Sequence, residues 1–127
     1  MSLVLDSGGV SALSRRDRQT AARIARLRQR GLWPPIVPTG VLVESLTGHG
    51  ARDALDNHLL RLSLIHPLDE SLARRAAELR SRTRAGSAVD AVVVATAELF
   101  EALVVTGDAG DLGRLVDHAS GVALLHA

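Results

Sequence analysis

The sequence predicts an α/β fold, a three-layer domain in which a short parallel sheet is flanked by helices. Short apolar runs of strand length alternate along the chain with longer amphipathic segments, which is the pattern of parallel strands joined by helices. The chain has 127 residues, 46% of them hydrophobic, and contains no Cys. A chain of this length can bury a core without disulfides or structural zinc. We therefore expect a single domain over residues 1–127.

The N-terminal part is predicted to form a strand and then a helix. Residues 3–5 are an apolar run of strand type, and the segment from Asp6 to Gly9 predicts a turn or helix start directly after it. Apolar residues mark one face of residues 18–30 and Arg covers the rest, while Gly31 is suited to end this amphipathic helix. Asp6 is thus expected at the carboxyl end of a strand.

A proline-rich segment separates this part from the next helix. Three Pro residues surround the apolar pair at positions 36–37, so only a very short strand fits there. Thr39 is suited to cap the helix that follows, which is expected to carry Glu44 in its early turns and to be closed by Gly48 and Gly50.

The middle of the chain repeats the alternation. Leucine spacing predicts a helix over residues 52–60, and residues 62–65 are a candidate for a short strand. Asp69 is suited to cap a further helix that Gly86 ends. Three arginines of that helix are expected to point outward: Arg74, Arg75 and Arg82.

A long apolar stretch over residues 88–101 gives a divided signal. Its three consecutive Val residues favour a strand, whereas its Ala residues, Glu98 and its length favour a buried helix. The stretch is too long for an ordinary strand, so we predict a helix. Ser87 and Asp90 have the spacing of a capping box at its start.

The C-terminal part completes the alternation. Residues 103–106 predict a buried strand that ends just before Asp108. Asp111 is suited to cap a short helix, and residues 122–125 predict the last strand.

The predicted fold brings acidic residues to one edge of the sheet. Helices that connect parallel strands run antiparallel to them, so strand carboxyl ends and helix amino ends share one rim, where ligands usually bind. Asp6 and Asp108 follow strands, Glu44 and Asp90 are expected to begin helices, and Asp111 can join them. Carboxylates without Cys or matching His suit Mg²⁺ or Mn²⁺. This is the ligand set of two-metal nucleases, which hydrolyse phosphodiesters.

Each of these acids also has a structural interpretation. Asp6 and Asp108 are possible turn residues, and Glu44 is a possible solvated helix residue. The capping box alone would explain Asp90, whereas Asp111 is divided evenly between an N-cap and a ligand.

The function is restricted further by the lack of Lys, by the lack of long apolar runs and by the distribution of charge. All 15 basic residues are Arg, which excludes P-loops and Schiff-base enzymes, because both need Lys. Short apolar runs broken by charge predict neither a membrane span nor a secretory leader, so we expect a cytoplasmic protein. Arginine gathers in the first third and before Gly86, which suggests a bound polyanion, although arginine on solvated helix faces is the simpler interpretation of any single residue.

The aromatic content indicates how a nucleic acid would be held. Trp33 and Phe100 are the only aromatic residues besides His, too few for a base-stacking platform. RNA would have to be recognised by its phosphates and shape, which favours a folded substrate. The candidate arginines are Arg16, Arg23, Arg26, Arg30, Arg82 and Arg84.

Four segments together resemble PIN-domain ribonucleases, and specifically the VapC-type toxins of bacterial toxin–antitoxin pairs. The segments are LVLDSGGVSAL, VPTGVLVESL, SAVDAVVVATAEL and VVTGDAGDL, which occur in the family's order. The resemblance implies cleavage of structured RNA with Mg²⁺ or Mn²⁺, a homodimer, and inhibition by a cognate antitoxin. It also implies a catalytic, metal-binding set of carboxylates with one supplementary acid and two supporting hydroxyls: Asp6, Glu44, Asp90 and Asp108, then Asp111, then Ser7 and Thr106.

Two features depart from the family pattern, and two other functions remain open. Gly8 and Gly9 follow Asp6 and Ser7 where a small residue followed by bulkier apolar ones is more usual, and Gly107 replaces a commonly polar or basic residue. Both departures predict a looser site. The alternatives are a catalytically silent PIN-like module that binds RNA or protein, and a metal-dependent phosphatase or DNA nuclease.

Overall fold

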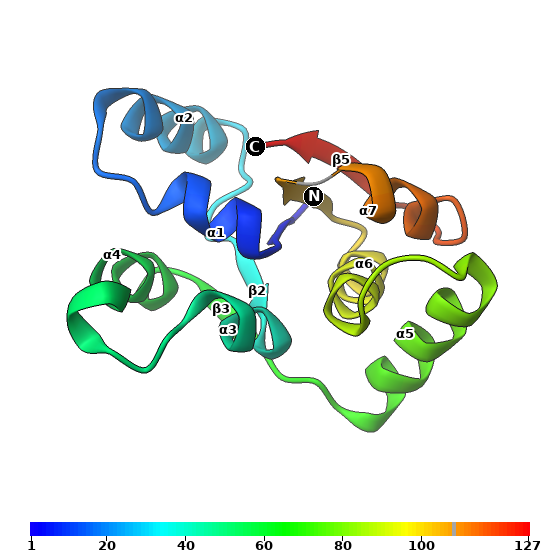
Figure 1. The fold of residues 1–127 in the computed structure, drawn as a ribbon. Coiled ribbons are helices and arrows are strands. Elements are labelled where there is room, and N and C mark those ends of the chain that lie inside the picture. The colour runs from blue at the N-terminus through cyan, green and yellow to red at the C-terminus, as the bar shows by residue number, and fades with distance from the viewer. Residues whose placement is uncertain (108) are drawn as a thin grey trace.

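The computed structural model describes residues 1–107 and 109–127, and its strands form one parallel sheet (Figure 1). The sheet has five strands in the order β3-β2-β1-β4-β5. The strands are β1 (Leu3–Leu5), β2 (Ile36–Pro38), β3 (Leu64–His66), β4 (Leu103–Thr106) and β5 (Ala123–His126). The helices are α1 (Ser7–Leu13), α2 (Arg18–Gln29), α3 (Thr39–Ser45), α4 (Gly50–Arg61), α5 (Glu70–Thr83), α6 (Ala88–Phe100) and α7 (Ala109–Val116).

The helices cover both faces of the sheet. Helices α1, α2 and α4 lie on one side and α5, α6 and α7 on the other, while α3 contacts both α1 and α6 (Figure 1). Helices α1 and α6 pack directly on the central strands β1 and β4. The predicted three-layer α/β architecture is therefore confirmed.

The central helix α6 follows from its composition. Residues 91–97 are all buried, since α6 packs against α5, α7 and three strands. A helix surrounded in this way is apolar on every side, which explains why its sequence resembles a strand locally. The predicted capping box is present, with Ser87 Oγ accepting from Asp90 N at 3.0 Å and Asp90 Oδ2 from Ser87 N at 3.1 Å.

The helix start predicted directly after Asp6 is confirmed, since α1 begins at Ser7. Two strand boundaries differ from the prediction. The third strand begins at Leu64, two residues later than predicted, because Leu62 and Ser63 still donate to carbonyls of the last turn of α4. The last strand is β5 (Ala123–His126).

The segment from Thr39 to Gly50 also differs from the prediction. Thr39 is the first residue of α3 and does not cap it; its hydroxyl accepts from Leu68 N at 3.2 Å. Helix α3 stops at Ser45, and Gly50 begins α4 instead of ending α3. The cause is buried Asp53, whose carboxylate accepts from the backbone N–H groups of residues 47 and 48 at 2.9 to 3.1 Å and thereby fixes the loop.

Two helix ends remain to be corrected. Helix α5 ends at Thr83, and the turn after it is made by Arg84 in the left-handed conformation (φ 55°) before Gly86 is reached. Asp111 lies inside the first turn of α7 and is not the residue that caps it. No helix in the described part of the chain is long and apolar enough to cross a membrane.

Candidate functional site

The strand order reverses at the centre of the sheet. From β1 the chain proceeds outward to β2 and β3, and it then returns to the other side of β1 to form β4 and β5. In open α/β sheets, ligands bind beyond the strand carboxyl ends at such a reversal. Leu5 pairs with Val105, so the residues that follow β1 and the end of β4 lie side by side there. We call this place the switch point.

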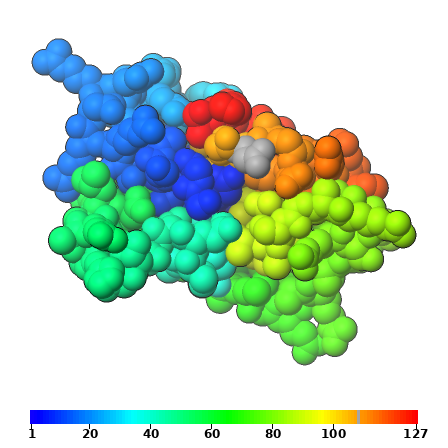
Figure 2. Space-filling model, in the orientation of Figure 1, coloured from blue at the N-terminus to red at the C-terminus, as the bar shows by residue number. Residues whose placement is uncertain are grey.

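Segments distant in sequence meet on this face of the molecule. In Figure 2 the dark blue start of α1 lies against the teal of α3 and the yellow start of α6, with the orange chain after β4 above it. The contacts of α1 with α3 and β4, and of α3 with α6, agree with this view. The predicted rim is therefore a surface to which four segments contribute.

Asp6 is the buried acid of the switch point. Asp6 is 7% exposed. Its Oδ1 accepts a hydrogen bond from Gly9 N at 2.7 Å, and this bond caps α1. Its own N–H donates to Val105 O at 3.3 Å. No described residue forms an ion pair with Asp6 or donates to Oδ2. A buried carboxylate is costly unless its charge is offset, so Asp6 is a credible ligand for a cation.

Glycines bring the two strand ends into close backbone contact. A Cβ on Gly8 would lie 2.5 Å from Gly107 N and 2.7 Å from Gly107 Cα. A Cβ on Gly9 would lie 2.5 Å from Val105 O. These distances are shorter than real Cβ contacts. The sequence suggested that these glycines loosen the edge. Instead, they allow α1 to pack directly on the end of β4.

Asp90 contributes from the start of α6. One of its oxygens is used in the capping box, and no described residue donates to the other. The side chain is half-buried, and Gly86 lies beside it, since a Cβ built there would be 3.5 Å from Asp90 Cβ. The capping role is confirmed and leaves Oδ1 for a second partner.

Glu44 is not where the sequence predicted it. It is the sixth residue of the seven-residue helix α3, in its last turn, and it is exposed. At 1.5 Å per residue it lies about 7.5 Å along the helix axis from Thr39. The prediction that Glu44 begins a helix is wrong because α3 is so short.

The remaining predicted site residues lie in different surroundings. Asp111 lies 3.8 Å from Arg114 in an exposed ion pair. Ser7 is the half-buried first residue of α1, and Thr106 is fully buried at the end of β4. Asp108 lies outside the described residues.

The donor types at this edge suit a hard divalent cation. Asp6, Asp90 and Glu44 offer only carboxylate oxygens, which Mg²⁺ and Mn²⁺ prefer. Within residues 1–107 and 109–127, however, no group of three or more His, Cys, Asp or Glu side chains could hold a metal ion. The residues fit such a cation by chemistry, and the described part alone does not complete its ligand set.

Arginines line several hollows around the switch point. One hollow of about 390 Å³ is lined by Gly8 and Gly107 together with Arg15 and Arg23. The next along α2, of about 220 Å³, is lined by Arg23, Arg26 and Arg30. Sequence reasoning missed Arg15, because only the fold shows that the chain before α2 returns to the switch point.

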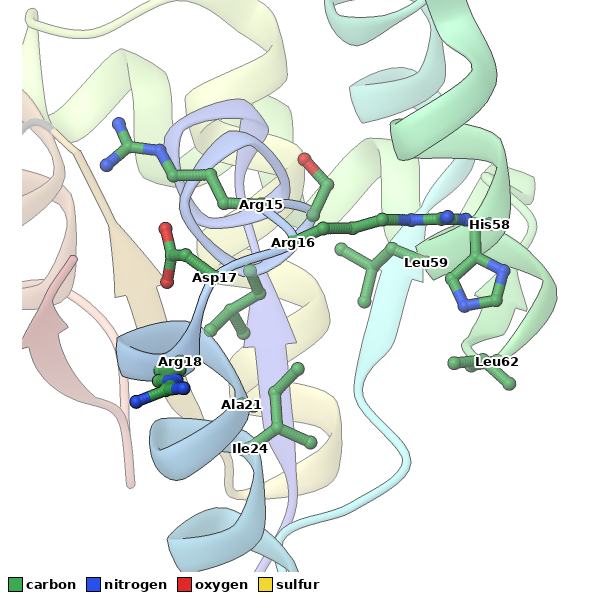
Figure 3. A pocket seen from close by; sticks show the side chains of 11 residues that line it. Arg15, Arg16, Asp17, Arg18, Ala21, Ile24, His58, Leu59 and Leu62 are labelled. Carbon is green, nitrogen blue, oxygen red and sulfur yellow. The ribbon is translucent and has the colours of Figure 1, made fainter.

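A third hollow lies between the chain before α2 and helix α4. It has a volume of about 490 Å³ and an apolar floor that includes Ile24 and Leu59. Figure 3 shows that Arg16 extends along it toward His58, whereas Arg15 points the opposite way. Arg16 therefore faces α4, while Arg15 is on the side of the switch point.

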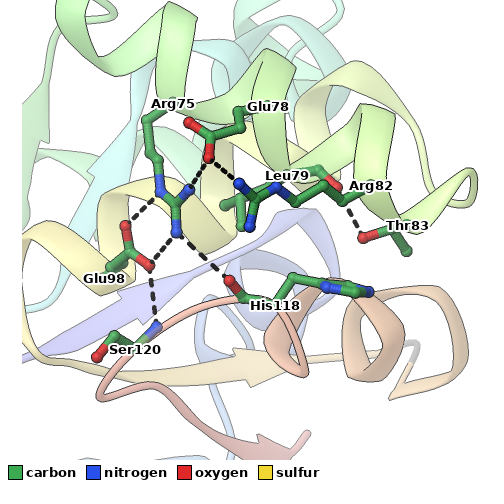
Figure 4. A network of polar contacts seen from close by, with 8 residues as sticks. All are labelled: Arg75, Glu78, Leu79, Arg82, Thr83, Glu98, His118 and Ser120. Carbon is green, nitrogen blue, oxygen red and sulfur yellow. Dashed lines mark hydrogen bonds and ion pairs between the residues drawn. The ribbon is translucent and has the colours of Figure 1, made fainter.

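Of the three arginines of α5 expected to point outward, Arg74 and Arg82 are exposed as predicted, whereas Arg75 is bound within the fold (Figure 4). Arg75 of α5 bonds Glu98 of α6 through Nε at 2.6 Å and Nη2 at 2.8 Å, so the prediction that it faces solvent is wrong. Arg82 lies 2.9 Å from Glu78. Arg84, by contrast, forms no ion pair with any described residue.

Comparison with known proteins gives one family match. The sequence model of the PIN domain matches residues 3–115 of this chain. No curated protein matches.

Solved structures share the fold at low sequence identity. FitAcB from Neisseria gonorrhoeae is 22% identical, with a TM-score of 0.70 over 97% of this chain and 96% of that one. VapBC2 from Rickettsia felis, bound to a DNA fragment from its promoter, is 14% identical, with a TM-score of 0.74 over 100% and 99%. DNA-bound VapBC from Salmonella typhimurium is 13% identical, with a TM-score of 0.72 over 99% and 98%.

Proposed function

Because this chain belongs to the PIN domain family, we propose that it is a divalent-metal-dependent endoribonuclease and the VapC-type toxin of a toxin–antitoxin pair. The observation that carries the proposal is Asp6, a buried carboxylate at the switch point with no cationic partner among the described residues. The substrate would be structured RNA, and residues 1–127 would act as one domain in the cytoplasm.

The carboxylates of the switch point would hold a metal ion in a fixed geometry. Asp6 is positioned by its bond to Gly9 N, and Asp90 by its bond to Ser87 N, so each keeps one oxygen for a further partner. A Mg²⁺ or Mn²⁺ ion held by Asp6, Asp90 and Asp108, with Glu44 and Asp111 nearby, would supply Lewis-acid activation of the phosphodiester. Ser7 and Thr106 would support the carboxylates with their hydroxyl groups.

The capping bonds provide a way to separate structure from chemistry. At the N-cap position, which Asp6 occupies, Asn caps a helix about as well as Asp but carries no charge. Asp90 is the third residue of its helix, and an Asn side chain there keeps an oxygen that can accept from Ser87 N. We expect Asp6→Asn and Asp90→Asn to keep the thermal midpoint and to lose at least about 100-fold in RNA cleavage, because loss of even an outer-shell partner of a metal ligand costs about 10- to 100-fold. The measurement is cleavage of labelled transfer RNA and stem-loop RNA with Mg²⁺ or Mn²⁺.

A matched control is available on α5. Asp69 caps that helix in the same way, accepting from Leu72 N at 2.8 Å, but it is exposed. Asp69→Asn should cleave like the wild type. Equal activity in all three variants would show that Asp6 and Asp90 are only caps and would remove the proposal. A preference for DNA or for a phosphate monoester would point to another hydrolase of this architecture.

A second function is favoured by one observation. Among the described residues, no group of three or more His, Cys, Asp or Glu side chains could hold a metal ion. A catalytically silent PIN-like binding module would also lack such a group. Calorimetric titration with Mn²⁺ separates the two functions. Binding that Asp6→Asn abolishes supports the nuclease, and the absence of binding supports the silent module.

The proposed partners follow from the same likeness. The structural neighbours include a toxin–antitoxin complex from Klebsiella pneumoniae, 18% identical to this chain. We infer a cognate antitoxin that blocks the site, and a homodimer of this chain. Co-expression with the product of a neighbouring small gene, followed by size-exclusion chromatography with light scattering, tests both.

A further inference from the structure

We propose that the RNA lies across the switch point with its backbone held on both sides, by Arg15 and Arg23 on one side and by Arg80 and Arg84 on the other. The inference rests on the proposed function and adds to it the residues that grip the substrate. It also specifies the substrate as a strand with phosphates on both sides of the reacting one.

The first pair of arginines, Arg15 and Arg23, lines a hollow that we call the α2 hollow. It is lined by Gly8, Gly107, Arg15 and Arg23, with Ser11 and with Asp17, the carboxylate that caps α2 through Thr20 N. Two guanidinium groups thus face one carboxylate, so the hollow remains cationic. Gly8 and Gly107 form the backbone contact of the switch point, so the hollow opens directly beside Asp6. Neither arginine forms an ion pair with a described residue.

The second pair of arginines, Arg80 and Arg84, lines a hollow that we call the α5 hollow. It has a volume of about 430 Å³, and its lining is small except for two arginines: Ala77, Arg80, Ser81, Arg84, Ala85 and Gly86. Gly86 lies against Asp90, so this hollow borders the other end of the acidic edge. Helices α2 and α5 lie on opposite sides of the molecule, with α1 and α6 between them (Figure 1).

The ion pairs of α5 separate its arginines into two groups. Three of them are neutralised by carboxylates: Arg74 by Glu70, Arg75 by Glu98 and Arg82 by Glu78. The other two, Arg80 and Arg84, have no carboxylate partner among the described residues, and both line the α5 hollow.

Arg84 is placed at the edge of the α5 hollow by the turn that ends α5. Its φ of 55° is in the left-handed region, as is the φ of 51° at Glu101, which ends α6 in the same way. At Arg84 this turn puts a charged side chain into the lining of the hollow.

The arrangement favours RNA over an acidic peptide as the occupant. Two cationic hollows that flank an acidic edge suit a continuous polyanion, one unit of which reacts between them. The shortage of aromatic residues leaves phosphate contacts as the main source of affinity.

The test is the salt dependence of RNA binding by three variants of the full chain. Arg23→Gln removes a charge from the α2 hollow, and Arg84→Gly removes one from the α5 hollow without threatening the fold, since glycine is favoured at its φ. Arg61→Gln is the control, because Arg61 is exposed at the far end of α4. The probe is a fluorescein-labelled RNA stem-loop in EDTA, with polyglutamate as a second ligand.

We expect Arg23→Gln and Arg84→Gly each to bind RNA about five- to eightfold more weakly than the wild type at about 0.1 M salt. In each variant the slope of log K against log salt concentration should be shallower by about 0.7 to 0.9. Arg61→Gln should keep the wild-type slope. Equal slopes in all three variants would overturn the inference, as would loss of polyglutamate binding with RNA binding intact. Cleavage is measured separately: a wild type that cleaves no RNA with Mn²⁺ contradicts the proposed function, whatever the slopes.

Discussion

Single residues at the switch point show why this edge of the sheet is built from glycine and aspartate. Gly8 and Gly9 sit in the first turn of α1, where the absence of a Cβ lets the helix backbone approach β4. Asp6 then caps the same turn from a buried position. Close approach and capping together fix the geometry of the acid, so the glycines contribute to the site although they carry no chemistry.

The two glycines in contact are not equivalent, which yields a prediction. A Cβ on Gly8 would lie 2.5 Å from backbone, whereas a Cβ on Gly107 would lie 3.2 Å from Gly8 Cα. We expect Gly8→Ala to destabilise the protein by about 1 to 3 kcal/mol through overpacking. Gly107→Ala should cost clearly less, because a shift of a few tenths of an ångström relieves it.

The comparison is made by urea unfolding together with RNA cleavage. Gly8→Ala should also lower activity, since it displaces α1 from the end of β4 and with it Asp6. Gly40→Ala is the control, because a Cβ there has only ordinary contacts at 3.8 Å. Equal stability of the Gly8 and Gly107 variants would contradict the steric explanation.

Among the elements, α5 and α6 are joined by a polar network that the sequence did not reveal (Figure 4). Arg75 binds Glu98 with two hydrogen bonds and also donates to His118 O at 3.3 Å. Ser120 N donates to Glu98 at 2.9 Å, so the chain after α7 is attached to the same carboxylate. The network therefore holds α5, α6 and the chain between α7 and β5 in one arrangement.

This network predicts a dependence of stability on pH. The hydrogen bonds from Arg75 lower the pKa of Glu98 below its usual value of 4.5, with a further contribution from Ser120 N–H. A carboxyl whose pKa is lower in the folded than in the unfolded state stabilises the protein above the unfolded value. That stabilisation is lost as the pH falls from about 4.5 through the folded pKa.

The variant Glu98→Gln should reduce this acid sensitivity. We expect it to lower the free energy of unfolding at pH 7 by about 1 to 3 kcal/mol, as for a charged hydrogen bond in a half-buried place, and to flatten the fall at low pH. The pKa values of Asp17 and Asp53 are also lowered, mainly by backbone hydrogen bonds. Part of the fall in the free energy of unfolding at low pH therefore remains in Glu98→Gln. Urea unfolding between neutral and acidic pH is the measurement.

The exposed pair of Glu70 and Arg74 supplies the comparison. Both side chains are largely exposed, at 80% and 79%, so solvent screens their interaction. Glu70→Gln should match the wild type at every pH within experimental error. An identical pH profile for Glu98→Gln and the wild type would show that the network is not a source of acid sensitivity.

At the scale of the whole molecule, the strand order determines where function can lie. Strands β1 and β4 are neighbours in space although about a hundred residues separate them in the chain. Their adjacency joins the end of the first strand to the end of the fourth and leaves arginine-lined hollows on either side. The fold thereby brings segments that are far apart in the chain to one edge of the sheet.

The sequence by itself determined the features that depend on local patterns. Alternating apolar runs predicted the parallel α/β class, length predicted that residues 88–101 form a helix, and spacing predicted the Ser87–Asp90 capping box. Asp6 was likewise expected after a strand, and it caps the helix that follows. These features were predictable because hydrophobic periodicity and capping act over a few residues.

Only the tertiary structure decided the features that depend on contacts between distant segments. Glu44 lies at the end of α3 because Asp53 fixes the following loop. Arg75 is bound by Glu98 of another helix, so it does not face solvent. Gly8 meets Gly107 across the switch point. In each case the partner is set by how the elements pack, and no periodicity within the chain specifies that packing.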